Sequence, residues 1–212
     1  MSVADMSMIL YNRSDVNGCH EGGVESMSRW EPNARGRLEQ AALDLYQERG
    51  FEQTTVAEIA ERAGLTERTF FRYFADKREV LFGGQTMLEE ICASAITNAP
   101  ASAAPLDAVT AALETSVPMF FQERHKLVRQ RQTVIAANQG LQERELLKGT
   151  LLTSAMAEAL RRRGVTDLAA SLAAEVGFIT LKTAYDRWIS EPDEQDLSQL
   201  IRASLDQLKG IW

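Results

Sequence analysis

The sequence has few of the residues that usually carry covalent or metal chemistry. Its 212 residues include two cysteines, Cys19 and Cys92, and two histidines, His20 and His125. The cysteines lie in very different contexts and predict neither a disulfide framework nor a metal site. Cys-His, Ser-His-Asp and Gly-rich phosphate-loop motifs are also missing. We therefore expect no enzymatic activity, no cofactor and no bound metal, and we expect His125, in a run of charged residues, to face solvent.

Long apolar runs and strand-like alternation are missing as well. No stretch of about 18 apolar residues occurs, so the sequence predicts no transmembrane helix. Together with the scarcity of cysteine, this favours a cytoplasmic location. Apolar residues recur instead at helical spacing along most of the chain, which predicts an all-α fold of about nine helices.

Acidic residues outnumber basic ones, and the formal net charge is −7. A nucleic-acid-binding protein is expected to be basic somewhere, so the total charge argues against one. Between positions 62 and 78, however, five bases accompany two acids, which gives a local charge of +3 (five minus two). Affinity for phosphate depends on such local placement. The bases are Arg62, Arg68, Arg72, Lys77 and Arg78, and the acids are Glu67 and Asp76.

One short stretch has the pattern of two helices joined by a tight turn. Thr55, followed three residues later by Glu58, predicts a capped helix start. Gly64 stands where this helix must stop, since glycine reaches positive φ without a Cβ clash. Thr66 then caps a second helix over 67–73. This is the helix-turn-helix pattern, whose second helix can enter the major groove of DNA.

The residues around this motif make the sequence similar to the TetR family of bacterial transcriptional regulators. The resemblance runs from Arg37 to about Phe82. It implies an N-terminal DNA-binding domain, a helical C-terminal domain that binds a small effector, and a homodimer. The matching residues, in order, are Gly50-Phe51, Thr54-Thr55, Ala63-Gly64-Leu65-Thr66, Tyr73-Phe74 and Lys77.

The pattern divides the chain into three parts. We expect a loosely ordered tail over 1–30, a helix-turn-helix domain over 31–78 with its motif at 55–74, and a helical effector-binding and dimerisation domain over 79–212. Asp76 is expected to cap the helix after the motif, and Pro118 to stand in the first turn of a later one. Besides those of the motif, helices are expected over 33–49, 77–96, 106–115, 117–137, 141–163, 167–190 and 192–209.

The N-terminal end of the second motif helix is expected to read bases. Arg68 could bond bidentately to guanine, Glu67 could accept from cytosine, and the Thr69 methyl group could touch thymine. Alternatively, Glu67 is only favourable at a helix N-terminus and Arg68 is only solvated.

The family resemblance also implies contacts with the DNA phosphates. These contacts map onto Phe71, Tyr73 and Lys77. Phe71 lacks the hydroxyl of the usual tyrosine, and Arg72 would replace that donor. The full set of expected DNA-contacting residues is Thr55, Thr66, Glu67, Arg68, Thr69, Phe71, Arg72, Tyr73 and Lys77.

Large side chains in the C-terminal helices are the candidates for effector binding. Tyr185 and Trp188 are three residues apart, so they share a helical face and could line a cavity. The alternative is that these residues only form core, as aromatic residues at helical spacing usually do. The candidate set is Phe120, Phe121, Arg131, Tyr185 and Trp188.

The last two helices have more apolar surface than one stripe against their own domain requires. We expect them to pair with the same helices of a second subunit in a four-helix bundle, with Leu205 in the seam. The apolar residues are Leu168, Leu172, Val176, Ile179 and Leu181 in the first helix, and Leu197, Ile201, Leu205 and Leu208 in the second.

These features favour a homodimeric transcriptional regulator. We expect a repressor that a small apolar or amphipathic effector releases from a palindromic operator in double-stranded DNA. The effector would move the helix after the motif and change the spacing of the two DNA-binding heads. The alternative is a helical, dimeric small-molecule-binding protein that no longer binds DNA. The acidic charge and Phe71 favour this alternative, and the intact pattern over 63–77 argues against it.

The first 26 residues show no helical period, and Met27 shortly precedes the family-like segment. One hypothesis is that translation starts at Met27; the other is a tail that contacts DNA. Deletion of residues 1–26 should leave folding and operator binding unchanged, because no core pattern begins before the first helix. Gel-shift titration of both forms checks this, and a loss of about tenfold or more in operator affinity would show that the tail is a functional arm.

Overall fold

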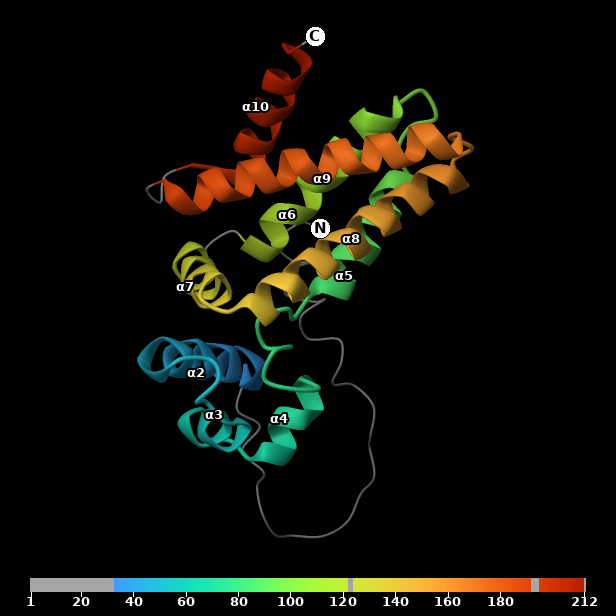
Figure 1. Cartoon of the computed structure of the whole chain (residues 1–212). Coiled ribbons are helices and arrows are strands. Elements are labelled where there is room, and N and C mark those ends of the chain that lie inside the picture. Colours follow the sequence, from blue (N-terminus) through green and yellow to red (C-terminus); the bar gives the residue numbers. More distant parts are fainter. Residues whose placement is uncertain (1–32, 122–123, 192–194, 212) are drawn as a thin grey trace, which may run out of the picture. The chain divides into compact units, whose positions relative to one another are not determined.

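The computed structural model describes residues 33–121, 124–191 and 195–211, and these ranges contain nine helices and no strand. The predicted all-α class is therefore confirmed, while the expected tail over 1–30 lies outside the described residues. No helix in these ranges is both long and apolar enough to cross a membrane. Figure 1 shows the helices, which are α2 (Ala34–Arg49), α3 (Val56–Arg62), α4 (Glu67–Tyr73), α5 (Gln85–Thr97), α6 (Pro105–Phe121), α7 (His125–Ala136), α8 (Gln139–Arg162), α9 (Asp167–Ser190) and α10 (Leu197–Lys209).

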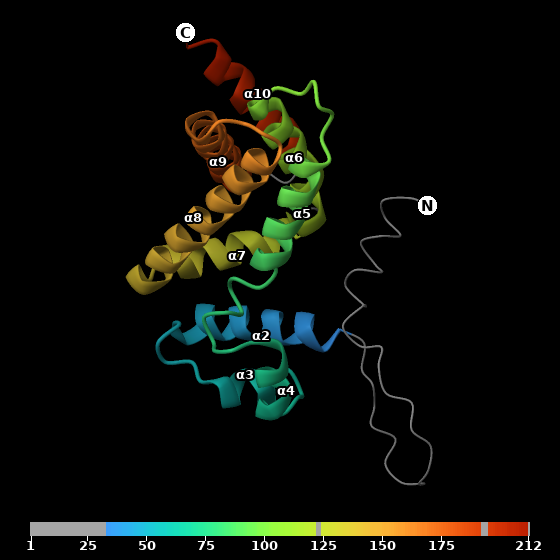
Figure 2. The same cartoon turned by 90° about the vertical axis from the view of Figure 1, so that its right-hand side faces the viewer.

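Two clusters of buried apolar side chains hold these helices together. The first, which we call the head core, joins α2, α3, α4 and the turns after α4 with Val134 and Ile135 of α7 and Leu141 of α8. The second, the C-terminal core, joins α5, α6, α8, α9 and α10 with Val128 of α7. Helix α7 therefore belongs to both cores. Figures 1 and 2 show it between α2 and the other C-terminal helices.

The helix after the motif begins later than expected. We expected it to start at position 77, but the segment before Gln85 forms turns. The Asp76 carboxylate accepts from the N–H groups of Arg78 (2.8 Å) and Glu79 (3.1 Å), so it caps a turn rather than a helix. Gly84 has a φ of 90° and ends this turn in a conformation that residues with a Cβ rarely adopt.

The helices predicted over 106–115 and 117–137 have other bounds in the structure. Helix α6 (Pro105–Phe121) joins the first to the start of the second, and the remainder of the second forms α7 (His125–Ala136). Helix α6 passes through Pro118, which therefore lies in a helix interior and not in a first turn as expected. Since proline has no N–H, the carbonyl of Glu114 loses its helical partner. Ser198 of α10 donates its hydroxyl to this carbonyl (3.3 Å), and Arg202 bonds the Glu114 carboxylate twice, at 2.7 and 2.9 Å. A neighbouring helix thus supplies the donor that proline lacks.

The apolar stripe of α10 is buried within its own subunit. Leu197, Leu200, Ile201 and Leu205 are at most 5% exposed, because α10 packs against α6 and α9. The expectation that Leu205 lies in a seam between subunits is therefore wrong. Exposed large apolar side chains are concentrated instead on α8 (Leu146, Leu147 and Leu151) and α9 (Leu168, Leu172 and Ile179).

Candidate nucleic-acid interface and ligand site

Helix α3 begins at the predicted capping box. The Thr55 hydroxyl accepts from the Glu58 N–H (3.3 Å), and the Glu58 carboxylate accepts from the N–H and the hydroxyl of Thr55, both at 2.9 Å. These two Thr55 contacts lower the pKa of Glu58. Arg49 of α2 also pairs with this carboxylate (2.6 Å). Thr55 is thus an exposed residue whose hydroxyl is used to start the helix.

The turn between α3 and α4 also follows the prediction. Gly64 has a φ of 67°, and the Leu65 N–H after it bonds the Ala60 carbonyl (2.8 Å). The Thr66 hydroxyl accepts from the Thr69 N–H (3.1 Å) and caps α4. The two threonine hydroxyls are themselves hydrogen-bonded at 3.0 Å. The Thr69 hydroxyl is therefore already hydrogen-bonded within the motif. Its methyl group is the part of the side chain that could contact a base.

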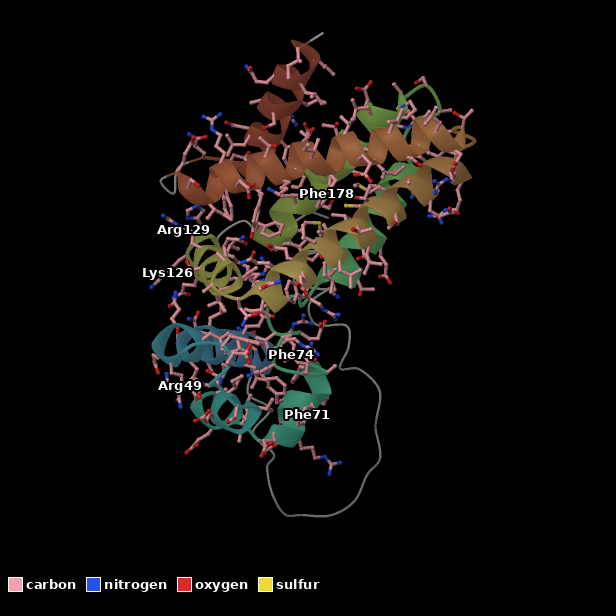
Figure 3. All side chains as sticks on the ribbon, viewed as in Figure 1. Arg49, Phe71, Phe74, Lys126, Arg129 and Phe178 are labelled. Carbon is pink, nitrogen blue, oxygen red and sulfur yellow. The ribbon has the colours of Figure 1, made fainter. Side chains whose placement is uncertain are left out.

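Helix α4 presents a charged and aromatic face to solvent. Glu67, Arg68, Phe71 and Arg72 are exposed, and Phe71 keeps 55% of its surface accessible. Figure 3 shows Phe71 on α4 and Phe74, which is buried, closer to α2. Within the described part of the chain, Glu67 and Arg68 form no hydrogen bond or ion pair. Both charged groups are available to a binding partner.

Arg72 and Tyr73 at the end of α4 form one unit. Arg72 donates to the Tyr73 hydroxyl (3.0 Å), and its guanidinium carbon lies 4.9 Å from the centroid of the Tyr73 ring. The Arg72 cation and the phenol therefore lie together on the last turn of α4. That Arg72 replaces the missing hydroxyl of Phe71 at a phosphate stays a prediction; both side chains are exposed.

Lys77 has a role that the sequence did not indicate. Its ammonium donates to the carbonyls of Phe51 (2.9 Å), Glu52 (3.1 Å) and Thr54 (3.0 Å). An ammonium has three N–H donors, so all three are used within the head. The Tyr46 hydroxyl in turn donates to the Lys77 carbonyl (2.6 Å). Lys77 thus ties the segment after α4 to the loop between α2 and α3.

Much of the positive charge predicted for the head is paired. Arg62 bonds Glu48 of α2 twice at 2.8 Å, and Arg78 bonds Asp76 at 2.6 and 3.1 Å. The hydrogen bond from Arg62 lowers the pKa of Glu48. The charge of +3 was counted over positions 62–78. Glu48 lies outside this range and reduces the local positive charge, because it pairs with Arg62. Among the five basic residues between positions 62 and 78, Arg68 is exposed and has no ion pair or hydrogen bond with any described residue.

Charged contacts connect the head with α7 and α8. The buried Glu39 of α2 pairs with Arg124 at the start of α7 (2.7 Å). After α4, Glu79 pairs with Arg144 and, at 3.6 Å, with Lys148 of α8. Arg35 of α2 also pairs with Glu39 (3.1 Å), so this carboxylate, whose side chain is only 8% exposed, is held by one cation of its own helix and one at the start of α7.

Arg131 of α7 touches both the head and the C-terminal core. Its Nε donates to the Leu81 carbonyl (2.5 Å), and its guanidinium carbon lies 5.2 Å from the centroid of the Phe82 ring. Its Nη1 bonds the Glu145 carboxylate (3.0 Å). Burial raises the pKa of Tyr185, and the nearby Arg131 guanidinium opposes this rise. Arg131 therefore joins one predicted effector residue to the segment that follows α4.

Three predicted ligand residues form an aromatic cluster between α6 and α9. Phe121 meets the rings of Tyr185 and Trp188 edge-on, with centroid distances of 5.4 and 6.4 Å. His125 was expected to face solvent, but its ring lies 4.4 Å from that of Trp188, and its Nε2 is 2.8 Å from the Trp188 carbonyl oxygen. No spacing in the sequence links these two residues, so sequence reasoning missed His125.

The fifth predicted ligand residue, Phe120, lies apart from this cluster. A Cβ on Gly84 would lie 3.4 Å from its ring, so Phe120 is next to the start of α5. Two shallow surface hollows of about 350 and 360 Å³ lie between α2 and α7 and are lined mostly by polar residues, none of them a predicted ligand residue. Figure 3 shows Lys126 and Arg129, which line one hollow, on α7. In the described ranges, no three His, Cys, Asp or Glu side chains group as metal ligands would.

Comparison with protein families agrees with this arrangement. A model described as "Bacterial regulatory proteins, tetR family" matches residues 39–82, which hold the motif. A second, described as "MftR C-terminal domain", matches residues 103–211, more than half of the chain. This chain belongs to the TetR family. The predicted resemblance is therefore confirmed, and it extends beyond the segment that carried it.

Individual TetR-family relatives share parts of the sequence or the fold. The HTH-type transcriptional regulator TcmR of Streptomyces glaucescens is 40% identical over 78 residues, which span 37% of this chain and only 34% of TcmR. SmeT, solved in complex with triclosan, aligns over 84% of this chain and 90% of its own, with a TM-score of 0.59 and 21% identity. A TetR-family regulator from Mesorhizobium loti aligns over 88% and 98%, with a TM-score of 0.53 and 19% identity. The two structures show a shared fold.

Lys77→Met should destabilise the protein by about 1–3 kcal/mol, because three backbone carbonyls lose a charged donor. Urea unfolding measures this change. Arg78→Met is the matched control, since the ion pair of Arg78 within the described residues is with the nearby Asp76 on the surface and its loss should cost less than about 1 kcal/mol. An unchanged free energy of unfolding for Lys77→Met, with a salt slope of DNA binding lower by about one, would show that Lys77 contacts phosphate as the resemblance implies.

Proposed function

We propose that this protein is a homodimeric transcriptional repressor that a small effector releases from a palindromic DNA operator. The observation that carries the proposal is the exposed face of α4 in a rigidly capped helix-turn-helix motif. A bacterial regulator of this kind must reach the chromosome, which lies in the cytoplasm, so a cytoplasmic location is part of the proposal.

Base reading is assigned to the N-terminal half of α4. Arg68 has the planar fork of donors that matches guanine, and it has no partner in the described ranges that would compete. Glu67 and the Thr69 methyl group lie on the same half of the helix. Phe71 adds an exposed ring that suits a thymine methyl group. Arg72 and Tyr73 provide the phosphate contacts at the other end of α4.

The second subunit is assigned to the exposed apolar faces of α8 and α9. Leu147 and Leu151 of α8 are 49% and 45% exposed, and Leu172 and Ile179 of α9 are 57% and 56% exposed. Two such helices from each subunit suffice for a four-helix bundle about a two-fold axis. The two heads would then read half-sites about one helical turn, or a multiple of it, apart.

The effector is assigned to the aromatic cluster of Phe121, Tyr185 and Trp188. Arg131, a charged neighbour of Tyr185, bonds the Leu81 carbonyl and lies over the Phe82 ring, and Leu81 and Phe82 are buried in the head core. A ligand that displaced Tyr185 or Arg131 would therefore shift the segment that joins α4 to α5. In a dimer, such a shift changes the separation of the two heads and weakens operator binding.

A gel shift with the DNA upstream of the protein's own coding sequence tests the proposed function. The wild type should bind one site there, and Arg68→Ala should lose about 1–3 kcal/mol at a single base position and relax specificity at that position. Glu61→Ala, at an exposed position on the other motif helix, is the control and should keep the specificity. Failure of the wild type to bind any upstream DNA would favour the alternative function, a helical small-molecule-binding protein without DNA recognition.

Leu172→Glu should convert the dimer into monomers, because it would place carboxylates across the two-fold seam. The monomers should remain folded, since Leu172 is exposed within the subunit, but should bind a full operator much more weakly. Light scattering measures the mass, and Gln207→Glu on the polar face of α10 is the charge-matched control. A wild type that is already monomeric at micromolar concentration contradicts this dimer.

A further inference from the structure

Most basic side chains in the described part of the chain have an ionic or hydrogen-bonded partner there. Three have none, and these are Arg68 on the exposed face of α4 and Lys126 and Arg129 on α7. The base reading proposed above accounts for Arg68. Neither the motif nor the aromatic cluster uses the two cations of α7. These two cations therefore require a separate explanation.

Lys126 and Arg129 are three positions apart on one helix, so their side chains are neighbours on its surface. Both are exposed, and Figure 3 shows them on the same side of α7. Like charges at this spacing repel each other and destabilise a helix. An anion bound between the two side chains would remove this repulsion.

Both cations line a surface hollow of about 360 Å³ between α2 and α7. The other residues that line it are Gln47 of α2 and His125, Gln130 and Thr133 of α7. The second hollow, of about 350 Å³, shares Lys126 and Gln130 with the first and adds Arg124. No described residue that lines either hollow is acidic. The concave surface between α2 and α7 is therefore positively charged, although the whole chain is acidic.

The side chains of this hollow have the donors that a phosphate group accepts from. The Arg129 guanidinium is a planar fork that matches two phosphate oxygens, and the Lys126 ammonium is a compact charge. The Gln47 side-chain oxygen accepts from Gln130 (3.1 Å), which leaves the amide nitrogen of Gln47 as a further donor. A phosphate ester has up to two negative charges and three acceptor oxygens, so one group can engage all three donors. A carboxylate has one charge and two oxygens, so the hollow favours phosphate.

The position of the hollow argues against DNA as the source of this phosphate. Helix α2 packs against α3 on one side and α7 on the other, and Figures 1 and 2 show it between α7 and the motif helices. A helix with its side chains is about 10 Å across. DNA on the exposed face of α4 would therefore be separated from Lys126 and Arg129 by α2. The volume of the hollow is also in the range of small-molecule sites.

We propose that the hollow between α2 and α7 binds the phosphate or diphosphate group of a small molecule, with Lys126 and Arg129 as its cationic contacts. Helix α2 belongs to the head core, and α7 packs in both cores. A ligand that contacts Gln47 and the two cations therefore joins the head to the C-terminal helices and stabilises the described arrangement of the two. The site shares no residue with the proposed effector site and does not include α4, so the inference goes beyond the proposed function.

Calorimetric titration of the full-length protein with sodium pyrophosphate, without DNA, tests the site. We expect one site per subunit with a dissociation constant of about 1 mM or lower. The double variant Lys126→Gln, Arg129→Gln should bind at least about tenfold more weakly. The control is Lys182→Gln, Arg187→Gln, which removes the same charge from α9, where both cations already have ion-pair partners. Its binding should equal that of the wild type. A wild-type dissociation constant above about 1 mM, or an equal loss in both double variants, overturns the proposal.

The stability of the same variants provides a second readout. The double variant at Lys126 and Arg129 should have an unchanged or higher urea midpoint, because it removes a repulsion and no bond. Pyrophosphate should raise the midpoint of the wild type and not that of this variant, since a ligand that binds only the folded state stabilises it. A variant that unfolds at lower urea concentration than the wild type would show that the two cations stabilise the fold itself, which contradicts the proposal.

Two further probes separate a phosphate ligand from other anions. Succinate, a dicarboxylate, should bind more weakly than pyrophosphate, and equal or tighter binding would refute the assignment to phosphate. The double variant should keep the salt slope of binding to a non-specific DNA duplex. A slope lower by about two would show that Lys126 and Arg129 contact DNA phosphates, and it would refute the small-molecule site. Because pyrophosphate binding is measured without DNA, failure to bind an operator would refute the proposed function alone.

Discussion

Helix α7 packs in two hydrophobic cores at once, and the rest of the structure depends on this constraint. Val128 lies in the C-terminal core, whereas Val134 and Ile135, about two turns later, lie in the head core. Arg131 stands between these positions and bonds the Leu81 carbonyl of the head. A short helix of 12 residues cannot shift in one core and stay fixed in the other, because packed interiors do not deform continuously. The head and the C-terminal core are therefore mechanically connected by packing.

The charged contacts beside α7 make this connection specific. Glu39 is buried against Arg124, and Glu79 lies between Arg144 and Lys148. Glu39 also pairs with Arg35 of its own helix (3.1 Å), so separation from Arg124 would weaken the compensation of its charge without abolishing it. Partly buried pairs of this kind add little net stability, but they require particular partners at particular positions. They therefore favour the described arrangement of the head and the C-terminal helices over arrangements in which these partners are apart.

The local features of the fold could be predicted from the sequence, and the long-range ones could not. The capping box of Thr55 and Glu58 and the turn at Gly64 depend on residues within five positions of each other, so the local sequence pattern was sufficient to predict them. Helix α6 continues through Pro118 because Ser198, some 80 residues later, donates to the free carbonyl. The loop carbonyls that bind Lys77 lie more than 20 residues away, and the partner of Arg131 in the head lies 50 away. Sequence reasoning identified Lys77, Tyr185 and Trp188 as important residues but had no means of assigning their contacts.

The same limitation explains why charge counted from the sequence neither predicts nor excludes DNA binding. A count over 62–78 gives +3, yet Glu48 of α2 neutralises Arg62, and the ammonium of Lys77 is surrounded by backbone carbonyls. With so few free cations, one head has only a small sequence-independent attraction to phosphate. Under the proposed function, discrimination by Arg68 and its neighbours, together with the second head of the proposed dimer, would provide most of the operator affinity. A DNA-binding protein built in this way can be acidic overall, and its operator affinity depends strongly on the spacing of its two heads.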